Sequence, residues 1–251
     1  MTEDGGPSGP VRIAMWSGPR NLSTAMMRSF GNREDCAVID EPFYAAYLKL
    51  SGADHPMRDE VLSRHETDWR KVAAELAGPA PGGKRLFYQK HMTHHMLPEI
   101  GRNFMRACRH AFLIRHPARV LASYAAKREA VELRDIGFVE QEELFEEAAS
   151  IMGRAPPVID ADSLLGAPRR VLTSLCEALG IPFSEKMLSW PPGPRDSDGI
   201  WAAHWYDSVH RSTGFEPPRP MPRLEDPHLR RIEAKALPIY ERLAAHALGA
   251  G

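Results

Sequence analysis

Short apolar runs alternate with longer stretches in which apolar residues recur every three or four positions. Short runs of this kind are typical of buried strands, and the three-to-four periodicity is typical of helices with one buried face. The predicted strands cover residues 11–16, 36–39, 86–89, 110–114 and 157–160. The predicted helices cover residues 23–30, 69–77, 118–127, 138–153, 168–179 and about 227–248.

Strands separated by helices favour right-handed crossovers and a parallel sheet that is covered on both faces. The order therefore predicts an α/β fold, a P-loop-type three-layer sandwich with a central, mostly parallel five-stranded sheet. Prolines and aromatic residues gather in 191–222, which we expect to form an irregular C-terminal cap. We expect residues 1–10 to be a disordered tail and 11–251 a single domain, with 190–251 as its cap and last helix.

Composition and charge limit the kinds of molecule that the protein is expected to bind. The 251 residues are 43% hydrophobic and 26% charged, with a formal net charge of −1. A nearly neutral chain has no overall field for nucleic acid, and no apolar run is long enough to span a bilayer, so we expect neither partner. Three cysteines at unpaired spacings and the absence of a secretory signal favour a cytoplasmic protein. The sequence does not determine the oligomeric state, so a homo-oligomer stays an open alternative.

The segment after the first predicted strand has the composition of a phosphate-binding turn. A glycine permits a tight turn, the following helix offers unpaired amides, and an arginine and two hydroxyls add donors. The residues of this loop are Ser17, Gly18, Pro19, Arg20, Asn21, Leu22, Ser23 and Thr24. An ordinary strand-to-helix turn with a serine cap is the alternative interpretation.

The loop differs from that of nucleotide triphosphatases, in which a second glycine is followed by lysine and a serine or threonine that binds Mg²⁺. Here the second glycine and the lysine are absent, and the basic residue, Arg20, comes early in the loop. This departure weakens, but does not remove, the alternative of a kinase or NTPase with a divergent loop.

A second segment runs from an apolar strand through Arg115, His116 and Pro117 into a helix that carries Ser123. The two segments together resemble those of sulfotransferases that use 3′-phosphoadenosine 5′-phosphosulfate (PAPS). The resemblance covers roughly residues 11–183. It implies PAPS as co-substrate, a 5′-phosphosulfate site in the first loop, and a 3′-phosphate site at Arg115 and Ser123 that Arg119 assists. It gives residues 158–164 a mainly structural role.

Transfer of a sulfuryl group to a hydroxyl or amine of a small-molecule or carbohydrate acceptor needs a base and cationic stabilisation of the leaving phosphate. Arg20 is the candidate for the phosphate, with no metal required. By resemblance Glu41, after the second strand, is the first candidate base. Lys90 and His91 follow the third strand, where related enzymes have Lys-x-His, with the lysine on the bridging oxygen and the histidine as base. The spacing of this pair is off by one, so the resemblance leaves Lys90 as a candidate donor to the transferring group and His91 as the second candidate base. A sulfotransferase-like protein that binds nucleotide without catalysis is a further alternative.

Three further groups complete the candidate site. His91, His94 and His95 have helical metal-ligand spacings, but no acidic or cysteine ligand accompanies them, so we expect a structural or acceptor-lining cluster. By resemblance a late basic segment covers the nucleotide, and the candidates for it are Arg211, Ser212, Thr213 and Gly214, with Arg195 as a competitor. The acceptor is expected among residues 43–60, 92–96 and 128–141.

Overall fold

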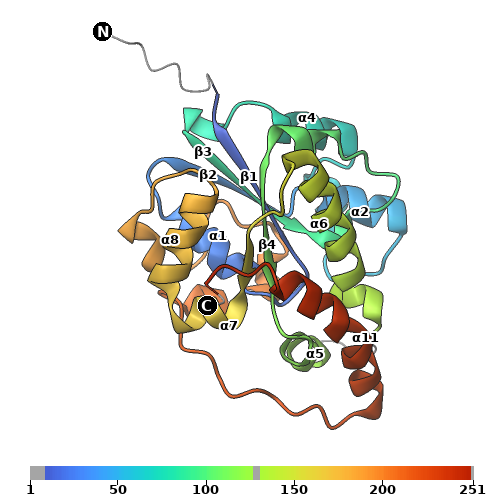
Figure 1. Cartoon of the computed structure of the whole chain (residues 1–251). Helices are drawn as coiled ribbons and strands as arrows, with labels where there is room; N and C mark the ends of the chain where they lie inside the picture. Colours follow the sequence, from blue (N-terminus) through green and yellow to red (C-terminus); the bar gives the residue numbers. More distant parts are fainter. Residues whose placement is uncertain (1–8, 127–130, 250–251) are drawn as a thin grey trace.

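The computed structural model describes residues 9–126 and 131–249, and its centre is a five-stranded sheet (Figure 1). All five strands are parallel, in the spatial order β2-β3-β1-β4-β5. Their bounds are β1 Val11–Ser17, β2 Cys36–Asp40, β3 Leu86–Met92, β4 Arg109–Ile114 and β5 Val158–Asp160. The predicted α/β fold is confirmed, and the sheet is entirely rather than mostly parallel.

Helices connect the strands and cover both faces of the sheet. The longer ones are α1 Ser23–Gly31, α2 Tyr44–Ser51, α4 Trp69–Ala77, α5 Pro117–Ala125, α6 Phe138–Met152, α8 Pro168–Ala178 and α11 Pro227–Ala244. The shorter ones are α3 Arg58–Arg64, α7 Ala161–Gly166, α9 Ala202–Trp205 and α10 Asp207–Arg211. Short 3₁₀ helices include η2 Thr93–His95, η3 Asn103–Ala107 and η4 Leu133–Ile136. Every helix predicted from the sequence is present in the structure. The last residue of the predicted helix 118–127, Lys127, lies outside the described residues.

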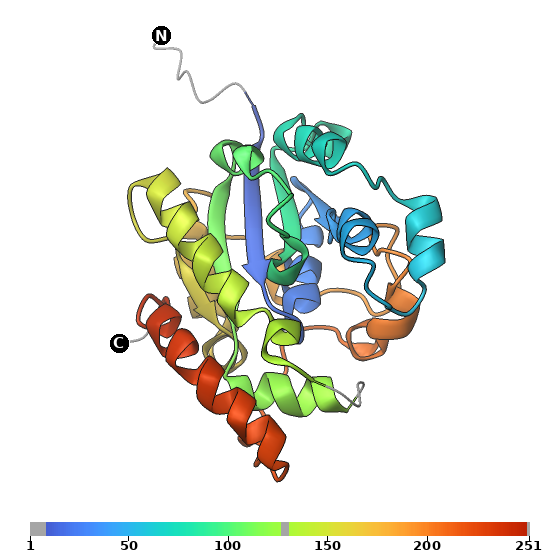
Figure 2. The ribbon, with the colours of Figure 1, turned by 90° about the vertical axis from the view of Figure 1, so that its right-hand side faces the viewer.

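Two hydrophobic cores lie on opposite faces of the sheet, because successive side chains of a strand point to opposite sides. On β1, Ile13 and Met15 belong to one core, whereas Ala14 and Trp16 belong to the other. The first core receives side chains from α1, α2 and α8, and the second from α4, α6 and α11. Figures 1 and 2 show α1 and α8 on one side of the strands and α6 and α11 on the other. The three-layer arrangement follows directly from this alternation.

The carboxyl ends of the parallel strands meet at one edge of the sheet, where ligands bind in open α/β folds. β1 lies between β3 and β4, so the chain leaves it toward one half of the sheet and returns to the other half. Ser17, Asp40, Met92, Ile114 and Asp160 end the five strands at this edge. The loops that carry the candidate residues are therefore brought together by topology.

The structure adds helices where the sequence suggested loops. Residues 43–60, expected as a variable loop, contain α2 and the start of α3, and Tyr44, Ala46 and Leu48 of α2 are buried. The proline-rich cap contains the short helices α9 and α10. Neither α2 nor α10 has a side-chain cap at its N-terminus, so the usual start signal is missing from the sequence.

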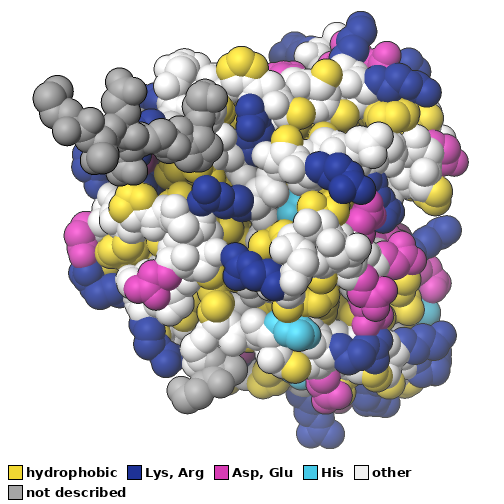
Figure 3. Space-filling model, turned by 45° about the horizontal axis from the view of Figure 1, so that its top comes forward, with side chains coloured by type: hydrophobic (Ala, Val, Ile, Leu, Met, Phe, Trp, Pro, Cys, Tyr) yellow, Lys and Arg dark blue, Asp and Glu magenta, His cyan; other side chains and the backbone are white. Residues whose placement is uncertain are grey.

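The surface carries both kinds of charge. On the face in Figure 3, basic and acidic side chains both occur, in keeping with the formal net charge of −1. Within residues 9–126 and 131–249, no helix combines the length and apolar character that crossing a membrane demands.

Candidate functional site

A cavity of about 640 Å³ follows the carboxyl edge of the sheet; we call it the edge cavity. It extends from the loop after β1 to the segments after β2 and β3, and α5 and the C-terminal cap also line it. Its polar lining includes Arg20, Ser23, Thr24, Glu41, Lys90, Arg115, Arg119, Ser123, Tyr206 and Ser212. Residues from both sequence motifs therefore meet in one space.

The loop after β1 presents some of its residues to the cavity and buries others in the fold. Pro19, Arg20, Leu22, Ser23 and Thr24 line the edge cavity. Ser17 and Asn21 are buried outside the lining; Ser17 Oγ contacts Met92 Sδ at 3.9 Å, and the Asn21 side-chain amide donates to Leu113 O at 3.3 Å. These two side chains fix the loop rather than face the cavity.

The first turn of α1 has the features of an anion site. Its N-cap residue, Leu22, has a left-handed backbone and supplies no side-chain hydrogen bond to the helix. The first amides of a helix have no partner within the helix, and residues of this turn, Ser23 and Thr24, line the edge cavity. An anion at this point would meet unpaired amides, the hydroxyls of Ser23 and Thr24, and the partial positive charge of the helix end.

Gly18 is needed for a different reason from the sharp turn that the sequence suggested. Its φ is not positive, but a Cβ atom at this position would lie 2.5 Å from Ile136 O. The η4 segment therefore packs directly on the loop backbone. Gly137 continues this contact, since a Cβ there would lie 2.7 Å from Thr93 Oγ1.

Hydrogen bonds join the two sequence motifs. Arg20 Nε donates to Ser123 Oγ at 2.9 Å, and an Arg115 guanidinium nitrogen donates to Arg20 O at 2.9 Å. Arg115 Nε is buried and has no partner among the described residues. The strand-end arginine, the loop arginine and the helix serine thus converge, with donors left for an anion.

Arg119 lines the same cavity but is occupied by protein groups. Its Nε donates to Asp162 Oδ2 at 2.7 Å, and its two terminal nitrogens donate to Arg219 O and Pro220 O at 2.6 and 3.2 Å. Asp160 caps α7 through Ser163 N and accepts from Tyr240 Oη at 3.0 Å. Arg119 therefore connects α5, α7 and the proline-rich segment.

Lys90 is at the centre of a buried polar cluster. Its ammonium group donates to Asp40 Oδ1 at 2.8 Å, Glu41 Oε1 at 2.5 Å and Tyr206 Oη at 2.7 Å. Tyr206 Oη also lies 2.7 Å from Asp40 Oδ2. An ammonium group has three N–H donors, so all three are used here. Lys90 orients the two carboxylates, and no donor is left over for a ligand while these contacts persist.

Of the two carboxylates that Lys90 contacts, Glu41 is the one that lines the edge cavity. Its backbone has a φ of 43°, in the left-handed region. Burial raises the pKa of Glu41 and outweighs the opposing effect of Lys90, while the neighbouring carboxylate of Asp40 raises the pKa further. Asp40 and Glu41 also hold the pKa of Lys90 well above its usual range, although burial alone would lower it. Lys90 therefore stays charged beside the carboxylates.

His91 lies on the other side of the sheet from Lys90, because the two residues are consecutive in β3. The imidazole stacks on Trp16 with ring centroids 4.4 Å apart and hydrogen bonds to Gln89 Oε1 at 3.2 Å. It is buried outside the lining of the edge cavity, and burial lowers its pKa to about 3. His91 therefore does not face the cavity that contains Glu41, and the structure does not support it as the second candidate base.

The predicted late segment reaches the cavity only in part. Ser212 and Gly214 line the edge cavity, whereas Arg211 and Thr213 are exposed outside its lining. The competitor Arg195 also lies outside the lining and donates to Pro191 O at 3.0 Å. Arg219, which the sequence did not single out, is the basic residue of the late segment that lines the cavity.

Tyr206 is a second residue whose position the sequence could not specify. It lies in the proline- and aromatic-rich cap, yet its hydroxyl contacts both Lys90 and Asp40. The sequence contains only an indirect signal for this contact. A lysine and two acidic residues at strand ends need further polar partners when they are buried. Within the described ranges, no group of three or more His, Cys, Asp or Glu is arranged to hold a metal ion.

The fold and the site combine a parallel α/β sheet with several arginines and the carboxylate of Glu41, which line one cavity at the sheet edge. The model of the sulfotransferase domain matches residues 11–247, so the chain belongs to the sulfotransferase domain family. Three solved structures share the fold at low sequence identity. The sulfotransferase domain from the curacin biosynthetic pathway has a TM-score of 0.52 at 16% identity, covering 90% of this chain and 97% of that one.

The other two structures give similar values. A sulfotransferase from Alicyclobacillus acidocaldarius has a TM-score of 0.53 at 15% identity, covering 94% of this chain and 95% of that one. The sulfotransferase domain of the Synechococcus PCC 7002 olefin synthase has a TM-score of 0.50 at 14% identity, covering 90% and 94%.

Two curated relatives are more similar in sequence. Branched-chain-amino-acid aminotransferase-like proteins 2 and 1 of Arabidopsis thaliana are 38% and 40% identical over 234 and 237 residues. These matches cover 93% and 94% of this chain but only 41% and 42% of the two relatives. The chain therefore spans about two fifths of their length.

Proposed function

We propose that the chain transfers a sulfuryl group from PAPS to a hydroxyl or amine of a small-molecule or carbohydrate acceptor. The observation that carries the proposal is the convergence of Arg20, Ser123 and Arg115 in the same cavity as Glu41. Two anion-binding segments and a carboxylate of raised pKa are what a bisphosphorylated donor and a proton acceptor require. Membership of the sulfotransferase domain family supports the same assignment.

The donor fits the groups that line the edge cavity. The α1 amides, Arg20, Ser23 and Thr24 would hold the 5′-phosphosulfate, and Arg115 with Ser123 would hold the 3′-phosphate. The buried and unpartnered Nε of Arg115 is the kind of donor that an anion satisfies. Ser212 and Gly214 of the cap also line this cavity and would cover the nucleotide. Arg119 holds this wall through its contacts with the backbone of 219–220.

The reaction moves one group and one proton. The acceptor oxygen or nitrogen forms a bond to sulfur while the bond between sulfur and the bridging oxygen of the 5′-phosphate breaks. The bonding electrons leave with that phosphate, whose charge Arg20 and the α1 amides stabilise. Glu41 takes the proton of the acceptor, and Lys90 keeps the carboxylate oriented.

Substitution of Glu41 separates binding from chemistry. We expect Glu41→Gln to leave the affinity for adenosine 3′,5′-bisphosphate (PAP) unchanged and to lower turnover of PAPS by about 100-fold or more, because the base is lost. Calorimetry with PAP and a radiolabelled sulfuryl-transfer assay measure the two quantities. Glu75→Gln, which neutralises an exposed carboxylate on α4, is the control and should retain turnover. Unchanged turnover in Glu41→Gln would contradict the assignment of the base.

The same calorimetry tests the two alternatives. Tight PAP binding that weakens by about 10- to 100-fold in Arg115→Ala supports the proposal, since a hydrogen bond to a charged group contributes about 1.5–3 kcal/mol. Arg106→Ala removes an exposed arginine of η3 and should leave PAP affinity intact. Binding of ATP–Mg²⁺ without PAP binding would instead favour a kinase or NTPase. PAP binding without any turnover would favour a non-catalytic nucleotide-binding protein.

A further inference from the structure

A second cavity, of about 420 Å³, adjoins the edge cavity; we call it the side cavity. α2, the loop after it, the segment after β3, η4 and α6 line this space. His55, His94 and Tyr124 line both cavities, so the two spaces meet at these three side chains. A molecule seated in the side cavity therefore reaches the space that contains Glu41.

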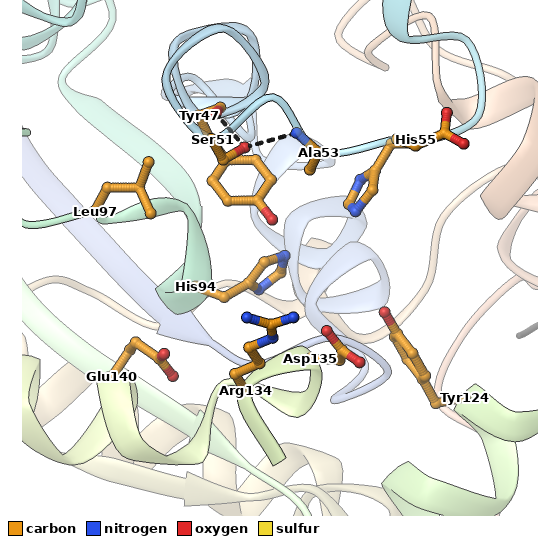
Figure 4. Close-up of a pocket in the computed structure, with 11 residues that line it drawn as sticks. Tyr47, Ser51, Ala53, His55, His94, Leu97, Tyr124, Arg134, Asp135 and Glu140 are labelled. Atoms are coloured by element: carbon orange, nitrogen blue, oxygen red, sulfur yellow. Dashed lines mark hydrogen bonds between the residues drawn. The ribbon is translucent and has the colours of Figure 1, made fainter. Parts of the chain in front are cut away.

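Polar side chains from separate elements point toward the centre of the side cavity (Figure 4). Tyr47 comes from α2, His94 from η2, Arg134 and Asp135 from η4, and Glu140 from α6. Ser51 at the end of α2 fixes the adjoining loop, since its hydroxyl donates to Tyr47 O at 2.7 Å and accepts from Ala53 N at 3.2 Å. The cavity is thus a built space with polar walls.

Acidic groups outnumber basic ones in the lining. Asp54, Asp135 and Glu140 contribute carboxylates, and Arg134 contributes one guanidinium. His94 adds no positive charge at neutral pH, because burial, with a further effect of His55, lowers its pKa to about 3. A cationic group is therefore favoured in this space over an anionic one.

Glu140 is the acidic group that most needs a cation. Its Oε2 is buried and has no hydrogen-bond partner within the described parts of the chain. Burial raises the pKa of Glu140, and Glu143 and Asp135 add to the rise. Asp135 is partly engaged, since it accepts from Glu132 N at 2.8 Å. An ammonium group beside Glu140 would supply the missing donor and offset the cost of the buried charge.

Histidine nitrogens add sites for hydroxyl groups. Nδ1 of His94 and Nδ1 of His95 are buried and unpartnered in the described structure. His95 is only 2% exposed, lines the edge cavity, and stacks on Tyr47 with ring centroids 4.8 Å apart. A neutral imidazole can donate or accept at this atom according to its tautomer, so it suits a hydroxyl.

From these contacts we infer that the side cavity binds the acceptor, and that the acceptor is a small hydroxylated molecule carrying an ammonium group, such as an amino sugar. Glu140 binds the ammonium group, and a hydroxyl of the acceptor extends past His94 toward Glu41. The inference rests on the proposed function, because only sulfuryl transfer makes the side cavity an acceptor site.

Three monosaccharides of matched size test the charge preference: glucosamine, glucose and glucuronate. Binding of each to the full chain saturated with PAP is measured by calorimetry or ligand-observed NMR. We expect glucosamine to bind about 10-fold more tightly than glucuronate, which corresponds to about 1.4 kcal/mol for one partly buried charge pair. In Glu140→Gln this preference should fall several-fold while PAP affinity stays the same. Glu143→Gln removes the same charge from an exposed position one turn away and should keep the preference.

The outcomes separate the two proposals. Absence of PAP binding would overturn the proposed function and the acceptor site with it. Normal PAP binding with no preference for glucosamine, including no detectable binding of any of the three sugars, would overturn the acceptor inference alone. A glucosamine preference that Glu140→Gln leaves intact would likewise overturn it, since Glu140 would not be the group that recognises the ammonium.

Discussion

Three non-glycine residues of the edge cavity have left-handed backbone conformations. The φ angles are 63° at Arg20, 65° at Leu22 and 43° at Glu41. Side chains other than glycine adopt this region at a cost of about 1–3 kcal/mol each, and such residues gather at functional sites. In the described chain the fourth example, Met57, lies outside the cavity lining. The strain is thus concentrated where the loop must present its arginine and where β2 must present its carboxylate.

At the loop itself, Gly18→Ala should destabilise the protein. The added Cβ would lie 2.5 Å from Ile136 O, so the loop or η4 must shift, at about 1–3 kcal/mol. Thermal unfolding should show a lower Tm, and PAP affinity should fall because the loop presents Arg20. Gly166→Ala is the matched control, since a Cβ there meets nothing within 4 Å. An unchanged Tm in Gly18→Ala would contradict the close packing.

Glu41 predicts how activity depends on pH. The base must be deprotonated, and its pKa is raised above the ordinary value of 4.5, chiefly by burial. Activity should therefore be lost as pH falls through this raised pKa, at a higher pH than for an exposed glutamate. A profile of kcat against pH locates this acid limb. A limb at or below the ordinary carboxyl pKa would show that Glu41 is not the titrating base.

Residue identity could be predicted from the sequence more readily than residue orientation. Arg20, Arg115 and Glu41 follow strands whose carboxyl ends meet in any parallel sheet, so the sequence order was sufficient to bring them together. Glu140 and Tyr206 come from elements far along the chain, and their contacts depend on three-dimensional packing. The need for glycine at position 18 also comes from tertiary packing, because a side chain there would collide with the backbone of Ile136.

Element by element, the long amphipathic helices and the strands were predictable, and the short helices were not. α2 has eight residues and no side-chain cap, and its burial comes from packing against the first core rather than from a strong periodic pattern. Short helices depend on such tertiary contacts for most of their stability. The segment 43–60 therefore has the sequence pattern of a loop. Part of it lines the side cavity, which we propose as the acceptor site.

The contact between the cap and the sheet makes a prediction at the scale of elements. Tyr206→Phe removes the hydroxyl that contacts Lys90 and Asp40, which leaves a buried charge with fewer partners, at about 1–3 kcal/mol. Urea unfolding should show the loss. Tyr88→Phe is a matched control, because the Tyr88 hydroxyl is buried and has no hydrogen-bond partner among the residues that the structure describes, so its removal should not destabilise. Equal stability of the two variants would contradict the role of Tyr206.

Across the whole molecule, buried histidines make stability sensitive to acid. Burial lowers the pKa of His91 and His94 to about 3 and that of His110 to about 4, all below the ordinary value of 6.5. The unfolded chain therefore binds these protons first, so stability present above pH 6.5 is lost as pH falls toward 4. Each histidine contributes a slope of up to about 1.4 kcal/mol per pH unit.

Unfolding in urea at several pH values between 4 and 7 measures this slope. His91→Phe keeps an aromatic ring beside Trp16 but removes one titrating group, so the slope should fall by up to about 1.4 kcal/mol per pH unit. An identical slope in wild type and variant would show that His91 is not among the groups that take up protons on unfolding.

The side chains of Lys90 and His91 lie on opposite faces of the sheet, and this has a consequence for how such a site can evolve. Because side chains in a strand alternate, the parity of a position decides which side of the sheet it serves. Inserting a single residue between these two would turn the imidazole toward the cavity and away from its aromatic stack. In this chain the pair is adjacent, so the histidine packs against Trp16, and the base that we propose, Glu41, follows the neighbouring strand β2. The insertion of one codon would therefore bring a second candidate base to the same cavity.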